Sequence, residues 1–168
     1  MAELTSRNRL QPALLDRLTD LHPDADSESR ERRVISLRQL RAGVLRDISH
    51  VLNARGLFGS ALQAYSDVAG SVLNAGLPDF TGKAASNVDR TMLAEKIAET
   101  IRCFEPRILA DTLRVSPVLS AQAARGNIMA FLVEGELWAQ PYPERLYLMT
   151  ELDLEDGQIS ISAADQQA

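Results

Sequence analysis

The sequence Phe104-Glu105-Pro106-Arg107 divides the chain into a part patterned for helices and a part patterned for strands. Proline has no amide hydrogen and disfavours the α conformation in the residue before it, so a helix that runs into this stretch must end there. We predict that the helix ends at Cys103 or Phe104. Glu105 and Arg107 then flank a stiff corner, where they either bind each other as a local ion pair or face outward as a docking point for another protein.

Before the corner, apolar residues recur at intervals of three and four, the spacing of amphipathic helices. The best defined helix is expected from Ser36 to Arg55 and should end at Gly56, because glycine readily adopts the left-handed conformation that follows a helix. Ser86 and Asp89 have capping-box spacing and predict the start of the helix that ends at the corner.

A further helical segment is expected around Tyr65, Val68, Val72 and Leu73. The segment 77–82 has the composition of a turn, with Leu77 and Phe80 as apolar anchors.

The N-terminal segment carries a stripe of leucines, which predicts a short amphipathic helix over residues 10–21. Residues 22–33 contain no apolar residue larger than alanine, and such a stretch cannot bury enough surface to offset the entropy of ordering it. We therefore assign residues 1–33 to an amphipathic helix and a polar linker, 34–162 to one α+β domain, and 163–168 to a frayed tail. The tethered helix either folds back on its own domain or fits into a groove of a partner.

After the corner, the apolar period changes to two, which is the period of strands. Strands are expected at 109–115, ending at Ser116-Pro117, at 127–138 and at 146–155. Asp156-Gly157 predicts a hairpin that leads into a last strand with Ile159 and Ile161. The fold class is α+β, with N-terminal helices packed on a small, mainly antiparallel C-terminal sheet. The last strand is expected at an edge, where unpaired amides and carbonyls can pair with a strand of another chain.

The composition restricts the class of protein. A chain of 168 residues suits one domain, and its net charge of -5 argues against a nucleic-acid partner. Cys103 is the only cysteine, so no internal disulfide is expected, which fits a reducing compartment. No apolar stretch approaches the roughly 20 residues of a membrane span. We expect a cytoplasmic protein without membrane insertion.

The sequence contains no zinc-ligand pairing, dinucleotide fingerprint or phosphate loop, so no catalytic residue, metal or cofactor is expected. Two functions remain open from the residues alone. One is a glycosidase, with Glu105 as the acid and, for example, Asp79 or Asp111 as its partner. The other is a regulatory adaptor that binds through its N-terminal helix.

Several motifs follow the leucine helix in a characteristic order. They are Val44-Leu45-Arg46-Asp47-Ile48 with Leu52-Asn53-Ala54-Arg55, then Ser71-Val72-Leu73-Asn74-Ala75-Gly76-Leu77-Pro78-Asp79, and then Ile101-Arg102-Cys103-Phe104-Glu105-Pro106-Arg107. This order resembles the TssE family of bacterial type VI secretion baseplate subunits, which are related to the lysozyme-like wedge proteins of contractile phage tail baseplates. The resemblance spans residues 10–162. Ala75 departs from the tyrosine common in the family, and Ala54 from the usual threonine.

The resemblance implies a structural, non-enzymatic subunit that joins the baseplate wedge and helps to initiate assembly of the contractile sheath. The alternative is a peptidoglycan-cleaving, lysozyme-like enzyme. The implied partners of the structural subunit are other wedge subunits, sheath subunits and the spike hub, in a cytoplasmic baseplate docked at the inner membrane complex. The Glu-Pro-Arg contact element of the family corresponds to residues 105–107 here. The expected protein-interaction residues are Glu105, Pro106 and Arg107, together with Leu14, Leu15 and Leu18 of the first helix.

Overall fold

The computed structural model describes residues 13–19, 24, 35–57, 64–118, 127–139 and 142–164. The helical elements are α1 (Leu14–Leu18), α2 (Leu37–Asn53), α4 (Ser66–Ala69), the 3₁₀ helices η2 (Val72–Asn74) and η3 (Ala85–Asn87), and α5 (Arg90–Phe104). The strands are β1 (Arg114–Val118), β2 (Ile128–Leu137), β3 (Glu144–Asp153) and β4 (Ile159–Ala163). Helices precede the sheet, so the predicted α+β class is confirmed.

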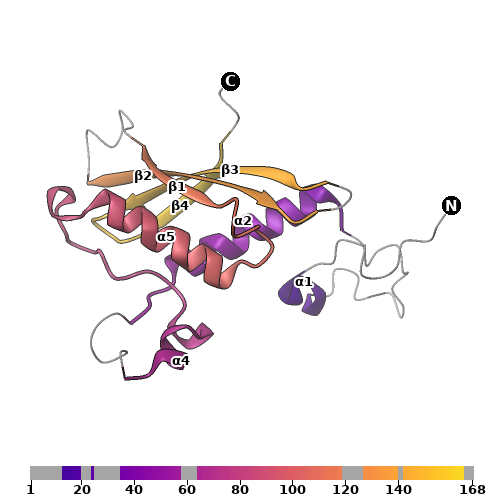
Figure 1. The fold of residues 1–168 in the computed structure, drawn as a ribbon, viewed down its shortest axis with the longest axis horizontal. Coiled ribbons are helices and arrows are strands. Elements are labelled where there is room, and N and C mark those ends of the chain that lie inside the picture. The colour runs from indigo at the N-terminus through magenta and orange to yellow at the C-terminus, as the bar shows by residue number, and fades with distance from the viewer. Residues whose placement is uncertain are drawn as a thin grey trace.

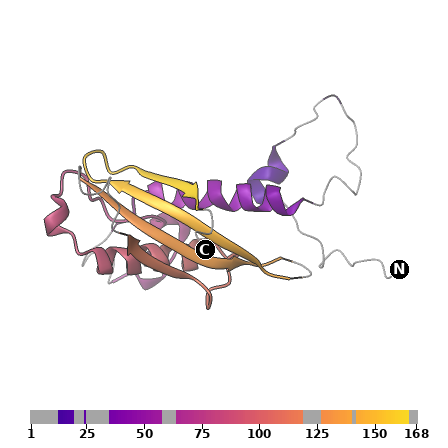
Figure 2. The ribbon, with the colours of Figure 1, turned by 90° about the horizontal axis from the view of Figure 1, so that it is seen from above.

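The four strands form one antiparallel sheet in the order β1-β2-β3-β4, and α2 and α5 cover one of its faces (Figures 1 and 2). Alternate residues of β2 and β3, such as Phe131 and Leu148, point into the core between the sheet and the helices. The helices contribute their apolar stripes, with Ile48 at the centre of α2 and Ile97 at the centre of α5. The apolar face of the sheet and the apolar faces of the two helices therefore form one core.

The predicted helix before residue 56 is confirmed, but its predicted end is wrong. Ser36 caps the helix in a capping box with Gln39. After Asn53, the chain becomes extended at Ala54 (φ -74°, ψ 149°), and Gly56 is not left-handed. The cause is a backbone pairing, because Leu77 donates to the carbonyl of Ala54 at 3.1 Å and accepts from the amide of Gly56 at 3.1 Å.

The start of α5 also differs from the prediction. Asp89 is itself the N-cap, and its carboxylate accepts from the amides of Thr91 at 2.8 Å and Met92 at 3.2 Å. Ser86 instead lies in η3, so the expected capping box is absent there. The end of α5 at Phe104 confirms the effect predicted for the proline.

The first strand begins later than predicted. Residues 109–112 form a turn in which Thr112 donates to the carbonyl of Leu109, and β1 continues through Pro117. A proline is tolerated because β1 is an edge strand with one neighbour. The strands predicted at 127–138 and 146–155, the hairpin at Asp156-Gly157 and the final edge strand are all confirmed.

Other predicted segments are only partly described. Residues 14–18 of the expected leucine helix form α1, whereas residues 10–12, 20 and 21 and most of the linker lie outside the described residues. The helical segment around Tyr65 is divided into α4 and η2. β4 extends to Ala163, and residues 165–168 lie outside the described residues. Within the described chain, no helix is both long and apolar enough to cross a membrane.

Candidate functional site

The Glu-Pro-Arg corner is held together by its own charges. Glu105 is 4% exposed, and its carboxylate accepts from Arg107 Nε at 2.7 Å and Nη2 at 2.5 Å. The backbone amide of Arg107 donates to the same carboxylate at 3.1 Å. The structure therefore shows the intramolecular ion pair, one of the two alternatives left open by the sequence. The carboxylate of Glu105 positions Arg107, while Pro106 is exposed and Arg107 is partly exposed. Contact of these residues with a partner stays a prediction.

The corner is also fixed to the sheet. Glu105 closes the last turn of α5 by donating its amide to Ile101 at 2.8 Å. Two residues later, the carbonyl of Arg107 accepts from the amide of Trp138, which follows β2, at 2.8 Å. Trp138 is 45% exposed and thus adds an aromatic surface beside the corner. Sequence reasoning missed this residue because it read Trp138 only as the end of a strand.

A chain of alternating charges links the corner to α2 and α1. Arg107 Nη2 lies 2.6 Å from Asp47 Oδ2, and Asp47 Oδ1 accepts from Arg46 Nε at 2.9 Å. Arg46 Nη2 lies 2.8 Å from the same oxygen but makes no hydrogen bond, so that second contact is electrostatic only. Arg46 Nη1 in turn binds Asp16 of α1. We call these five residues, Asp16, Arg46, Asp47, Glu105 and Arg107, the ion chain.

The ion chain favours the charged forms of Asp16, Arg46 and Arg107. The hydrogen bond from Arg46 lowers the pKa of Asp16 below its usual value, although partial burial opposes this shift. The hydrogen bond to Glu105 raises the pKa of Arg107, again against a burial effect. Because three carboxylates alternate with two guanidinium groups, each inner charge has an opposite charge on both sides.

The leucines of α1 face away from the domain. Leu14 is 71% exposed, Leu18 is 75% exposed, and no residue of α1 is buried. Among the described residues, the ion pair of Asp16 is the polar contact that ties this helix to α2. The helix thus lies against its own domain through a charge while its apolar stripe stays open. The role of Leu14, Leu15 and Leu18 in binding a partner stays a prediction.

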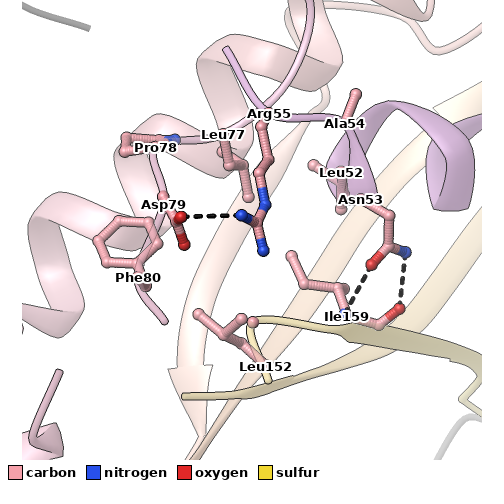
Figure 3. Close-up of a pocket in the computed structure, with 11 residues that line it drawn as sticks. Leu52, Asn53, Ala54, Arg55, Leu77, Pro78, Asp79, Phe80, Leu152 and Ile159 are labelled. Carbon is pink, nitrogen blue, oxygen red and sulfur yellow. Dashed lines mark hydrogen bonds and ion pairs between the residues drawn. The ribbon is translucent and has the colours of Figure 1, made fainter. Parts of the chain in front are cut away.

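The two other motifs meet at the end of α2 (Figure 3). Arg55 Nη1 binds Asp79 Oδ2 at 2.9 Å, next to the backbone pairing of residues 54–56 with Leu77. Gly76 has φ 129°, and a Cβ there would lie 2.2 Å from the carbonyl oxygen of Ala54. The side chain of the buried Asn74 accepts from the amide of Leu57 at 2.6 Å and donates to the carbonyl of Ala69 at 3.2 Å. These motif residues therefore hold the loops together.

Asn53 contacts the last strand. Its Oδ1 accepts from the amide of Ile159 at 2.8 Å, and its Nδ2 donates to the carbonyl of Ile159 at 2.9 Å (Figure 3). The second hydrogen of Nδ2 is donated to the carbonyl of Ser49 at 2.9 Å. A side-chain amide thus pairs with β4 as a neighbouring strand would. The sequence signal for this contact was the asparagine in the second motif, but its partner lies 106 residues away.

No arrangement suited to catalysis is found in the described part of the chain. The cavity beside Asn53 has a volume of about 20 Å³, about the space of one water molecule. It is lined by Asp79 but not by Glu105 or Asp111, so the carboxylate pair of the enzyme alternative does not meet there. In the same described ranges, no group of three or more histidine, cysteine, aspartate and glutamate residues is placed to hold a metal.

The fold and these motifs describe an α+β domain whose charged and asparagine motifs organise contacts within the chain. The family model described as baseplate wedge protein gp25 matches residues 38–142, which is more than half of the chain. The match spans α2, α5, the corner and β2. No curated protein and no solved structure matches. The chain belongs to the gp25 baseplate wedge family of contractile phage tail-like systems, of which TssE is the type VI homologue.

Proposed function

We propose that this chain is the TssE-type wedge subunit of a type VI secretion baseplate and that it helps to initiate assembly of the contractile sheath. The observation that carries the proposal is the family match over residues 38–142, a range that contains the motifs resembling TssE. Wedge proteins are structural, so the proposed function is assembly and not catalysis. Its partners would be other wedge subunits, sheath subunits and the spike hub, in a cytoplasmic baseplate docked at the inner membrane complex.

The corner offers the first contact surface for these partners. Glu105 is buried and bound to Arg107, so it acts through Arg107 and does not itself reach a partner. The surface that remains is the exposed ring of Pro106, the partly exposed guanidinium of Arg107, and Trp138 beside them. Arginine and tryptophan are enriched among residues that dominate binding energy at protein interfaces.

Two further surfaces extend the proposed contact. β4 is an edge strand, and an open edge supports pairing with a strand of a sheath or baseplate subunit. The exposed leucines of α1 suit an apolar groove on a neighbouring subunit. Because the three surfaces belong to one chain, binding at one of them raises the effective concentration at the others.

The test is affinity purification of the tagged chain from the bacterium that encodes it, with mass spectrometry of the bound proteins and imaging of fluorescent sheath. The expected partners are type VI wedge and sheath proteins, and Trp138→Ala should reduce their recovery while circular dichroism and thermal melting stay close to those of the parent. Tyr142→Ala, at another exposed aromatic residue, is the control.

Two results would change the proposal. Recovery of phage tail proteins alone would keep the family and overturn the type VI assignment. Peptidoglycan cleavage that depends on Glu105 would overturn the structural function in favour of a lysozyme-like enzyme.

A further inference from the structure

The free edge of β4 exposes backbone groups only at alternate residues. The amide of Asp153 donates to the carbonyl of Gln158, and the amide of Ala164 donates to the carbonyl of Tyr147. With the register Thr150 opposite Ile161, the even-numbered residues of β4 therefore bond to β3. The odd-numbered residues, Ile159, Ile161 and Ala163, point their amides and carbonyls away from β3.

The first of these three positions is already filled. Asn53 binds both the amide and the carbonyl of Ile159, whereas the outward groups of Ile161 and Ala163 have no hydrogen-bond partner among the residues that the structure describes. Asn53 is held in place by its own bond to Ser49, and both hydrogens of its Nδ2 are thereby used. Displacing it from Ile159 would break two hydrogen bonds, so an incoming strand has open positions only beyond Ile159.

We propose that Asn53 is a specificity-determining residue that stops an added strand at Ile159 and so fixes the register in which a partner strand pairs with β4. This inference rests on the proposed use of β4 as a pairing edge and adds the position at which pairing begins. The added strand exchanges hydrogen bonds with Ile161 and Ala163. We place it antiparallel to β4, like every other pair in this sheet.

The same geometry defines the chemistry of the partner strand. Ile161 packs against the edge of the core, whereas Ser160 and Ser162 are exposed on the other face. Residues paired with Ile161 and Ala163 lie on the core side of the sheet, and the residues between them lie beside the serines. The partner is therefore an extended segment that alternates apolar and polar residues, with its apolar side toward the helices.

The register can be mapped by disulfide exchange. Full-length chain carrying Cys103→Ser receives one new cysteine, either Ser160→Cys or Ser162→Cys, and is mixed in glutathione buffer with a short peptide of alternating valine and serine that has one central cysteine. On the free edge, both positions form non-hydrogen-bonded pairs, in which side chains are close enough for a disulfide. A peptide joined at residue 162 can pair with Ile161 and Ala163, whereas one joined at residue 160 can pair with Ile161 alone.

In the parent background, the adduct at Ser162→Cys should exceed that at Ser160→Cys by about tenfold, the effect expected from one lost pair of hydrogen bonds. In the Asn53→Ala background, the ratio should fall to about one because Ile159 becomes available. Asn87→Ala, which removes an exposed asparagine with no hydrogen bond to β4, should leave the ratio unchanged. Ser66→Cys in α4 gives the background level of exchange.

A second readout covers the case in which Asn53→Ala does not fold. Hydrogen exchange in the unsubstituted chain should show that the peptide protects the amides of Ile161 and Ala163 and leaves that of Ile159 unchanged. Equal adducts at both positions in the parent, adducts at neither position above background, or new protection of Ile159 each overturn the inference. Purification of the baseplate partners decides the proposed function separately, because it does not depend on the register at β4.

Discussion

Arg107 binds both carboxylate oxygens of the buried Glu105 across the proline that separates them, at 2.7 Å and 2.5 Å. The same guanidinium reaches Asp47 of α2 at 2.6 Å, so the end of α5 is joined to α2 by charge as well as by apolar packing. A motif that the sequence offered as a docking point is thus also a structural joint. Substitutions at its two charged ends therefore separate its roles.

Arg107→Ala should destabilise the domain more than Glu105→Ala. Removing the arginine leaves a carboxylate buried without its counter-charge, a change that typically costs about 3 to 5 kcal/mol. Removing the glutamate leaves Arg107 partly exposed and still paired with Asp47, so the free energy of unfolding should fall by about 2 kcal/mol. Urea unfolding followed by circular dichroism measures both free energies.

Arg55→Ala is the control for these charge substitutions. Its ion pair with Asp79 is largely exposed, with 61% and 51% of the two side chains accessible, and such pairs contribute little to stability. If Arg107→Ala changed the free energy of unfolding no more than this control does, the structural role of the corner would be refuted.

Gly76→Ala should severely destabilise the domain, by more than about 2 kcal/mol. The glycine has positive φ, and a Cβ there would strike the carbonyl of Ala54, whose oxygen accepts the pairing bond of Leu77. Gly82→Ala is the matched control, because Gly82 also has positive φ (75°) but a Cβ there meets no atom within 4 Å. Thermal melting of the two variants separates the steric clash from backbone strain, and equal losses would contradict the clash.

Replacing Leu14, Leu15 and Leu18 together by serine should leave the stability of the domain within about 0.5 kcal/mol of the parent, because surface substitutions of this kind remove no buried contact. The same variant should recover less of the proposed baseplate partners. Urea unfolding measures the stability of the variant, and quantitative pull-down measures its recovery of partners. Normal recovery by a folded variant would exclude the leucines of α1 from the interface.

The elements predicted well are those whose signal lies in neighbouring residues. The alternation of leucines around Leu148 defined β3, and the proline after Glu105 defined the end of α5, because both effects act over a few residues. The prediction that Gly56 is left-handed was wrong because a distant residue, Leu77, pairs with the backbone at that point. Propensity is a weak guide where tertiary contacts impose the backbone.

The site was harder to predict for the same reason. Glu105 and Arg107 are two positions apart, so their pairing was among the alternatives that the sequence allowed. The bond of Asn53 to Ile159 and that of Arg46 to Asp16 join segments that only the fold brings together. The sequence gives the donor and the acceptor in each case, but it gives no rule for choosing them among many equivalent side chains.

The attachment of α1 should depend on pH through Asp16. Its pKa is lower in the folded chain than the usual value of about 3.9, because Arg46 donates to the charged carboxylate. The carboxylate therefore contributes stability that is complete above the unfolded pKa and is lost as the pH falls through the folded pKa. Both side chains are about one third exposed, so the contribution is at most about 1 kcal/mol.

The expected outcome is that α1 is held at pH 7 and released in acid below the folded pKa of Asp16. The methyl NMR signals of Leu14 and Leu18, followed from pH 7 downward, report this release, while the signals of Leu148 report the core. Asp16→Asn should give the released spectrum already at pH 7, and Asp24→Asn should behave like the parent. If the α1 signals of the parent and of Asp16→Asn were identical at pH 7, Asp16 would not hold the helix, and the attachment would have to come from apolar contacts that are insensitive to pH.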